Sequence, residues 1–164
     1  MTQDPFTLLG LPAEFDLSPE ELERRYLSAA ATHHPDRHPD PLDQADAAER
    51  TAEINTAYQM LREPESRANA LLALRGGPSA ADDRSLPPTL LMEMMEVGEA
   101  VEKAAEKKDG PTLSRLRGEV EQKRAAHLEA VGALFQAEPM DPAAIRLELN
   151  GLRYVERTLS QWPV

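Results

Sequence analysis

Two prolines, at positions 35 and 39, interrupt the stretch His-His-Pro-Asp-Arg-His-Pro-Asp that covers residues 33–40. A proline lacks the backbone N–H and has a fixed φ, so no helix continues through it, and the residue before it is driven toward extended geometry. Small and polar residues precede the stretch, and an Ala- and Glu-rich run follows it from Leu42. We therefore predict a rigid, exposed loop between two helices. Because such loops often carry binding residues, His34 and Asp36 are candidates for a site.

Four helices are expected in the first half of the chain. Their predicted ranges are 6–11, a segment that opens at 18, about 43–61, and 66–74. Gly10 suits the end of the first helix, because glycine accepts the left-handed conformation without steric cost. Ser18 is expected to cap the second helix, with Pro19 in its first turn and Glu21 as the partner in a capping box. Helical spacing predicts a core face on the third helix at Ile54, Ala57, Tyr58 and Leu61.

The second half of the chain is predicted to be a bundle of three helices. A segment rich in Gly and Pro, residues 76–88, is expected to be a linker between two domains, 1–75 and 89–164. The bundle helices are expected over about 88–107, to about 136 after a break at 109–111, and from an N-cap at Asp141 followed by Pro142. Their apolar residues recur at spacings of three and four, as a bundle requires. These seam residues are Leu90, Met94, Val97, Val101 and Ala104; Leu116, Val120, His127, Val131 and Leu134; Ile145, Leu149, Leu152 and Leu159. The chain is therefore expected to be all-α.

The composition of the chain argues against several kinds of partner and site. The chain has 18 Lys and Arg against 29 Asp and Glu, a formal net charge of -11. This excess of negative charge argues against nucleic acid and against an anionic membrane surface. The absence of Cys excludes disulfides and thiolate-ligated metals or clusters. No apolar run is long enough to span a membrane, and the first residues do not resemble a signal peptide, so we expect a cytoplasmic protein.

The first bundle helix carries more apolar residues than its seam uses. Leu91, Met92 and Met95 are expected on the side away from the seam, and Tyr154 of the last helix is expected off its own seam. Charged residues flank the methionines. An exposed apolar patch with an aromatic and a polar rim is typical of a protein-docking surface, although the same residues could instead pack against the first half or another bundle helix.

The first half resembles a J-domain. The residues that carry this resemblance are Phe6-Thr7-Leu8-Leu9-Gly10-Leu11, Tyr26, the triplet His34-Pro35-Asp36, and Ile54, Asn55, Ala57, Tyr58 and Leu61. The run from Arg62 to Ala68, followed by Leu71-Leu72, narrows the resemblance to the HscB family, the J-type co-chaperones of iron–sulfur cluster assembly. The resemblance covers nearly the whole chain.

The resemblance implies two partners and no enzymatic activity of the chain itself. A DnaK/HscA-type ATPase chaperone would contact His34, Pro35, Asp36, Arg37, Arg25 and Arg24. An IscU-type iron–sulfur scaffold protein would contact Leu91, Met92, Met95, Glu96, Glu99 and Tyr154. Two departures concern charge: Lys103 replaces an acidic residue of the family pattern, and the second helix carries fewer basic residues than is usual in J-domains.

Other interpretations of the sequence remain open at this point. The chain could be a general J-domain co-chaperone for unfolded clients. It could also be a small metal-binding regulator, since His33, His34, His38, Asp36 and Asp40 are possible zinc ligands, although the prolines make it hard to aim three of them at one point. We expect no physiological metal and no cofactor, and we expect His127 to be a hydrogen-bonded core histidine. Of the two His-Pro-Asp triplets we assign function to the first, because it directly follows a helix.

Overall fold

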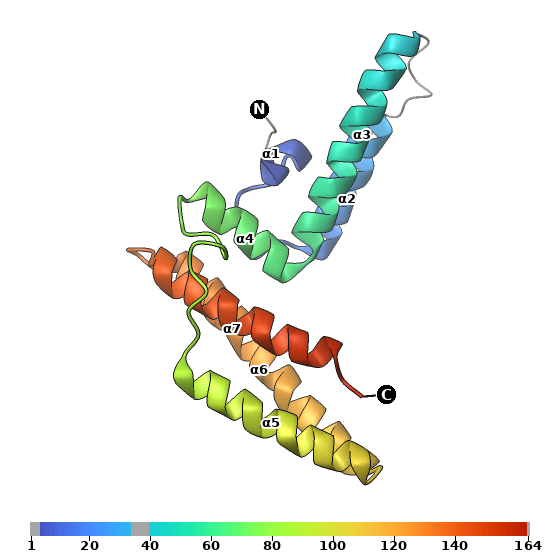
Figure 1. Cartoon of the computed structure of the whole chain (residues 1–164). Helices are drawn as coiled ribbons and strands as arrows, with labels where there is room; N and C mark the ends of the chain where they lie inside the picture. Colours follow the sequence, from blue (N-terminus) through green and yellow to red (C-terminus); the bar gives the residue numbers. More distant parts are fainter. Residues whose placement is uncertain (1–3, 34–39, 164) are drawn as a thin grey trace. The chain divides into compact units, whose positions relative to one another are not determined.

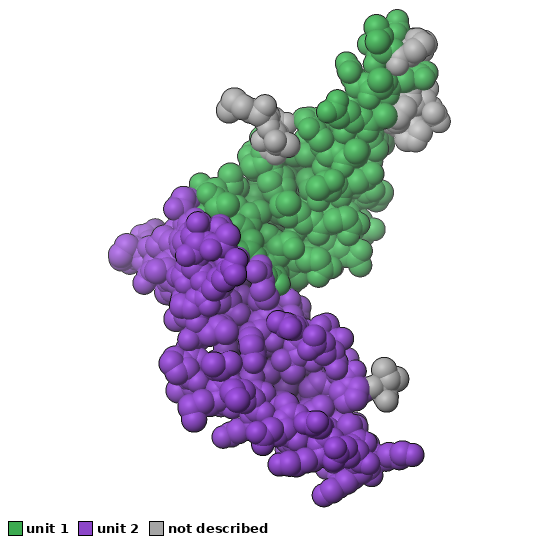
Figure 2. All heavy atoms as spheres, viewed as in Figure 1, with its two compact units in different colours: residues 1–75 green, residues 76–164 purple. Residues whose placement is uncertain are grey.

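The computed structural model describes residues 4–33 and 40–163. Within these residues it contains seven helices and no strand, so the all-α prediction is confirmed. The chain divides into two compact units, residues 1–75 and 76–164, which Figure 2 shows in green and purple. Each unit is described by itself.

The N-terminal unit is built around a pair of helices that run side by side (Figure 1). Its helices are α1 (Pro5–Leu9), α2 (Pro19–Thr32), α3 (Pro41–Arg62) and α4 (Pro64–Leu74). Each has a proline in its first turn, where the missing N–H costs no helical hydrogen bond. The short first helix ends as expected at Gly10, whose φ of 63° is left-handed.

Two helix starts in this unit differ from the predicted ones. Helix α3 was expected from about Asp43 but begins at Pro41, because the Asp40 side chain accepts a hydrogen bond from the Leu42 N–H at 2.8 Å. The second His-Pro-Asp triplet was interpreted as loop, and its last residue is in fact a helix cap. Helix α4 begins at Pro64 rather than at residue 66, directly after α3 ends.

The core of the N-terminal unit joins all four helices. The predicted face of α3 is confirmed at Ile54, Ala57 and Leu61, which are buried, while Tyr58 is half-buried. The other buried side chains are Phe6 and Leu9 of α1, Leu22 of α2, Ala47 of α3, Ala68, Leu71 and Leu72 of α4, and Leu11 and Phe15 between α1 and α2. Apart from Ala47, the buried residues of α2 and α3 lie in the halves of these helices that are remote from the loop.

The C-terminal unit is the predicted three-helix bundle. Its helices are α5 (Pro88–Glu106), α6 (Gly110–Gln136) and α7 (Pro142–Ser160). Asp109 and Asp141 cap α6 and α7 by accepting hydrogen bonds from first-turn N–H groups. Gly151 permits a close approach of α7 to α6, because a Cβ at this position would lie 2.6 Å from Cε1 of His127. The predicted seams are largely confirmed, since Leu90, Met94, Ala104, Leu116, Val120, Val131, Ile145, Leu149 and Leu152 are all buried.

The segment that precedes α5 is packed onto α7 for part of its length. The amide nitrogen of Asn150 donates hydrogen bonds to the carbonyls of Asp83 and Ser85 at 3.1 and 3.0 Å. Leu86 packs against a core cluster formed by α5, α6 and α7. Residues 83–86, which were expected to belong to a linker, are therefore fixed to the bundle.

Candidate functional site

The predicted chaperone-binding loop lies outside the described residues, as do His34, Pro35, Asp36, Arg37 and His38. The structure describes the two ends that hold it. His33 ends α2, and its carbonyl accepts a hydrogen bond from the Thr51 hydroxyl of α3 at 3.0 Å. On the other side, Asp40 caps α3. Both ends of the loop are thus attached to helices that pack on each other.

Tyr26 joins the same two helices. Its ring stacks on that of Tyr58, with centroids 4.2 Å apart and planes 19° apart, and its hydroxyl donates a hydrogen bond to Oδ1 of Asn55 at 3.0 Å. Stacked aromatic pairs of this kind add specific orientation to apolar burial. Tyr26, Asn55 and Tyr58 therefore fix the alignment of α2 and α3, and all three are among the residues that carry the J-domain resemblance.

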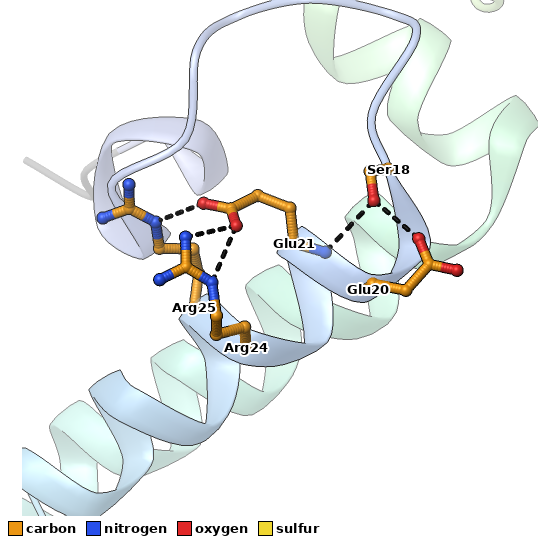
Figure 3. A network of polar contacts seen from close by, with 5 residues as sticks. All are labelled: Ser18, Glu20, Glu21, Arg24 and Arg25. Atoms are coloured by element: carbon orange, nitrogen blue, oxygen red, sulfur yellow. Dashed lines mark hydrogen bonds and ion pairs between the residues drawn. The ribbon is translucent and has the colours of Figure 1, made fainter.

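Arg24 and Arg25, two of the three arginines expected to contact the chaperone, both contact Glu21 (Figure 3). Nε of Arg24 and Nε of Arg25 each donate to the Glu21 carboxylate at 2.8 Å, and these bonds, with Arg24 first, lower the pKa of Glu21. Both arginine side chains stay exposed, at 69% and 46%. Exposed ion pairs of this kind are weak, so Glu21 does not hold either arginine firmly.

The predicted capping box at the start of α2 is only half formed. Ser18 accepts a hydrogen bond from the Glu21 N–H at 3.3 Å, as expected. The Glu21 carboxylate turns to the two arginines, and the Ser18 hydroxyl donates to Glu20 at 2.6 Å (Figure 3). Glu21 thus limits the net positive charge that α2 presents.

The apolar residues predicted on the outer side of α5 are exposed. Leu91, Met92 and Met95 show 40%, 65% and 58% of their surface to solvent. Glu96 and Glu99 on the same helix are also exposed, and Glu99 forms an ion pair with Lys103 at 3.8 Å. Lys103, which stands where the family pattern has an acidic residue, therefore lowers the negative charge beside the exposed patch of Leu91, Met92 and Met95.

Tyr154 differs from its predicted position. It was expected to lie off the seam with little contact to the core, but it is half-buried and packs against the cluster of Leu90, Met94, Val120 and Val155. Because this half-buried side chain contacts the core cluster, its removal should also affect stability. The pattern of α7 misled the prediction because Val155 is itself buried and widens the core face at that turn.

Two buried polar residues of α7 escaped the sequence-based interpretation. Arg146 and Asn150 are 1% and 8% exposed, and Nε of Arg146 donates to Oδ1 of Asn150 at 3.1 Å. Their position in the sequence could have indicated their burial, because they are four residues apart and each is next to a leucine or isoleucine of the seam. Asn150 connects Arg146 to the segment before α5.

His127 is satisfied, as predicted. It is half-buried, and its Nδ1 lies 2.6 Å from a carboxylate oxygen of Glu148.

Among the described residues no group of three or more His, Cys, Asp or Glu is arranged to hold a metal ion, and the histidines proposed as alternative zinc ligands at positions 34 and 38 are not among them. In the same part of the chain, no helix combines the length and the apolar character that crossing a membrane requires.

Comparisons with known proteins point to the same family in both units. Residues 4–70 match the model of the DnaJ domain, and residues 86–161 match that of the HSCB C-terminal oligomerisation domain. A relative in Burkholderia multivorans, the "Co-chaperone protein HscB homolog", is 33% identical over 162 residues, which cover 95% of this chain and 90% of the relative. The solved structure of chaperone HscB from Vibrio cholerae aligns over 97% of this chain and 94% of its own, with a TM-score of 0.83 and 25% identity. The crystal structure of human co-chaperone protein HscB gives the same TM-score and identity and covers 98% of this chain and 80% of the human one.

Proposed function

The chain belongs to the HscB family of J-domain co-chaperones, and on that premise we propose that it activates a DnaK/HscA-type chaperone and delivers an IscU-type iron–sulfur scaffold protein to it. The observation that carries this proposal is the order of the two domains, a DnaJ domain followed by an HscB C-terminal domain in one chain. ATP would be hydrolysed by the chaperone, and the co-chaperone would act by binding, in the cytoplasm.

The N-terminal unit would supply the contacts that activate the chaperone. His34, Pro35, Asp36 and Arg37 would bind the hydrolysis-competent state of the chaperone better than its other state, because a ligand shifts an equilibrium only through such a difference. The hydrogen bond from Thr51 and the cap at Asp40 support this role, since they fix both ends of the loop. Arg24 and Arg25 of α2 would contact an acidic surface of the chaperone.

The C-terminal unit would bind the scaffold. The exposed side chains of Leu91, Met92 and Met95 suit a docking surface, since methionine adapts its shape to a partner. Glu96 and Glu99 would form its polar rim, and Tyr154 would contribute an aromatic contact from α7. Binding of both partners to one chain would raise the concentration of scaffold near the chaperone.

We assign chaperone activation to residues 1–75 and scaffold binding to residues 89–164, with residues 76–88 between them. Two separate binding units predict that each activity can be lost without the other. A variant that loses chaperone activation through the loop should still bind scaffold, and a variant of the α5 patch should still activate the chaperone.

Single-turnover ATPase measurements test the proposal with purified chaperone, scaffold and full-length co-chaperone. We expect the co-chaperone alone to accelerate hydrolysis and the scaffold to add a further increase that depends on the α5 patch. No acceleration at any concentration would refute chaperone activation. Acceleration by unfolded model clients as large as that by the scaffold would favour a general J-domain co-chaperone instead.

A further inference from the structure

A cleft of about 560 Å³ lies in the C-terminal unit, between α7 and the segment that precedes α5. Its apolar lining comes from Ala80, Ala81, Leu86 and Tyr154, and the last two also pack against the bundle core. Asn150 lines the cleft and holds the two walls together through its hydrogen bonds to Asp83 and Ser85. Leu86, Tyr154 and Asn150 are therefore already fixed by the bundle, so these parts of the cleft need little ordering on binding.

The charge of the cleft is opposite to that of the chain. Three arginines line it, Arg84, Arg153 and Arg157, and no acidic residue does, although the formal net charge of the chain is -11. Within residues 4–33 and 40–163, the guanidinium groups of Arg84 and Arg157 have no carboxylate partner.

The aspartates nearest in sequence to Arg84 are engaged elsewhere. The Asp82 carboxylate accepts hydrogen bonds from the hydroxyl and N–H of Ser79, and Asp83 accepts the equivalent pair from Ser85. These bonds lower the pKa of both carboxyl groups, and neither aspartate lines the cleft. The charges of Arg84 and Arg157 are thus available to a ligand.

We propose that this cleft binds an acidic segment of the scaffold protein, with carboxylates on the arginines and an apolar side chain against Leu86 and Tyr154. Arginine favours carboxylates because its planar fork can donate two parallel hydrogen bonds. A short acidic peptide fits better than nucleic acid, because the negative charge of the whole chain repels an extended polyanion. The choice of the scaffold as occupant rests on the proposed function.

The cleft would fix the orientation of the bound partner. Tyr154 belongs both to the cleft and to the proposed scaffold-docking surface, whose rim on α5 is acidic at Glu96 and Glu99. A partner would then need basic charge facing α5 and acidic charge facing Arg84 and Arg157. Such opposed charges favour one docking orientation and raise the association rate.

The test compares two full-length double variants with the same change of charge. Arg84→Gln with Arg157→Gln removes the two cleft cations. Arg115→Gln with Arg117→Gln removes two exposed cations of α6 that do not line the cleft. Scaffold affinity is measured by calorimetry from low to high salt, after melting temperatures have shown that both variants are folded.

We expect the cleft variant to bind scaffold about fivefold more weakly than wild type at low ionic strength, the loss expected for two exposed charge pairs. The difference should vanish near 1 M salt, where the screening length is about 3 Å. The α6 variant should bind like wild type. Equal affinity of the cleft variant and wild type at every salt concentration would overturn the proposal, as would an equal loss in both variants.

A second probe separates this proposal from the proposed function. If wild type does not bind scaffold at all, scaffold delivery is wrong, and a fluorescein-labelled Glu- and Leu-rich peptide then tests the cleft by anisotropy. Binding of this peptide to wild type and not to the cleft variant would support an acidic-segment site. Absence of peptide binding would overturn it, and so would preferential binding of a labelled single-stranded oligonucleotide.

Discussion

Replacing Asn150 by alanine should destabilise the C-terminal unit by removing three hydrogen bonds at once. The Asn150 amide donates to two backbone carbonyls, those of Asp83 and Ser85, and accepts from Nε of the buried Arg146. Alanine can neither donate nor accept through its side chain. The substitution would leave Nε of Arg146, a residue only 1% exposed, without this partner.

The magnitude follows from the three bonds. Each neutral hydrogen bond contributes about 1 kcal/mol, and one to a charged group contributes about 1.5–3 kcal/mol. Asn150→Ala should therefore lower the free energy of unfolding of this unit by about 3–5 kcal/mol. This is a large part of the roughly 5–15 kcal/mol that stabilises a typical domain.

Urea unfolding followed by the fluorescence of Trp162 measures this loss. Trp162 is the single tryptophan of the chain and packs against the core cluster of the C-terminal unit, so its signal reports on that unit. Gln122→Ala is the matched control, since Gln122 is an exposed amide side chain on α6. Asn150→Asp is informative as well. It keeps an oxygen that accepts from Arg146, but it replaces the amide nitrogen with a second oxygen, which cannot donate to the carbonyls of Asp83 and Ser85.

A small effect would refute the reasoning. If Asn150→Ala shifts the urea midpoint no more than Gln122→Ala does, the attachment of residues 83–86 to α7 contributes little stability. If Asn150→Asp is as stable as wild type, the donated bonds to the segment are not the source of the effect, and the contact with Arg146 carries it.

Four further predictions concern the proposed partners and the loop. His34→Gln should abolish stimulation of the chaperone ATPase in single-turnover assays while His38→Gln should not, and an equal loss in both would mean that the whole loop acts as one site. Met92→Ala should weaken scaffold binding in calorimetry by about 1 kcal/mol or more with an unchanged melting temperature. Tyr154→Ala should weaken scaffold binding and also lower the melting temperature, because the half-buried side chain packs against the core cluster; an unchanged melting temperature would contradict that packing. Thr51→Val, which removes the hydrogen bond from α3 to the carbonyl that precedes the loop, should reduce the stability of the N-terminal unit by about 1 kcal/mol in urea unfolding followed by circular dichroism, and an unchanged midpoint would show that this bond contributes nothing.

The helix starts were largely readable from the sequence because caps act locally. Ser18 before Pro19 and Asp141 before Pro142 combine a side-chain acceptor with a residue that needs no helical N–H, and both mark helix starts in the structure. The same combination at Asp40 and Pro41 went unrecognised, because these residues were assigned to the His-Pro-Asp loop. The helical periodicity of the seams also depends only on neighbours within a few residues, so most of the bundle core was predicted correctly.

The sequence by itself determined the helices, their seams and the exposed methionines of α5, because these depend on spacing along one helix. Only the tertiary structure decided where Tyr154 and Asn150 lie. Asn150 is 65 residues from Ser85 in the chain, and the half-buried position of Tyr154 depends on Leu90 and Met94 of another helix. The three arginines of the cleft likewise come from two distant segments. Burial and the grouping of charges are set by contacts between elements, and a periodic pattern within one element carries no information about which residues of another will face it.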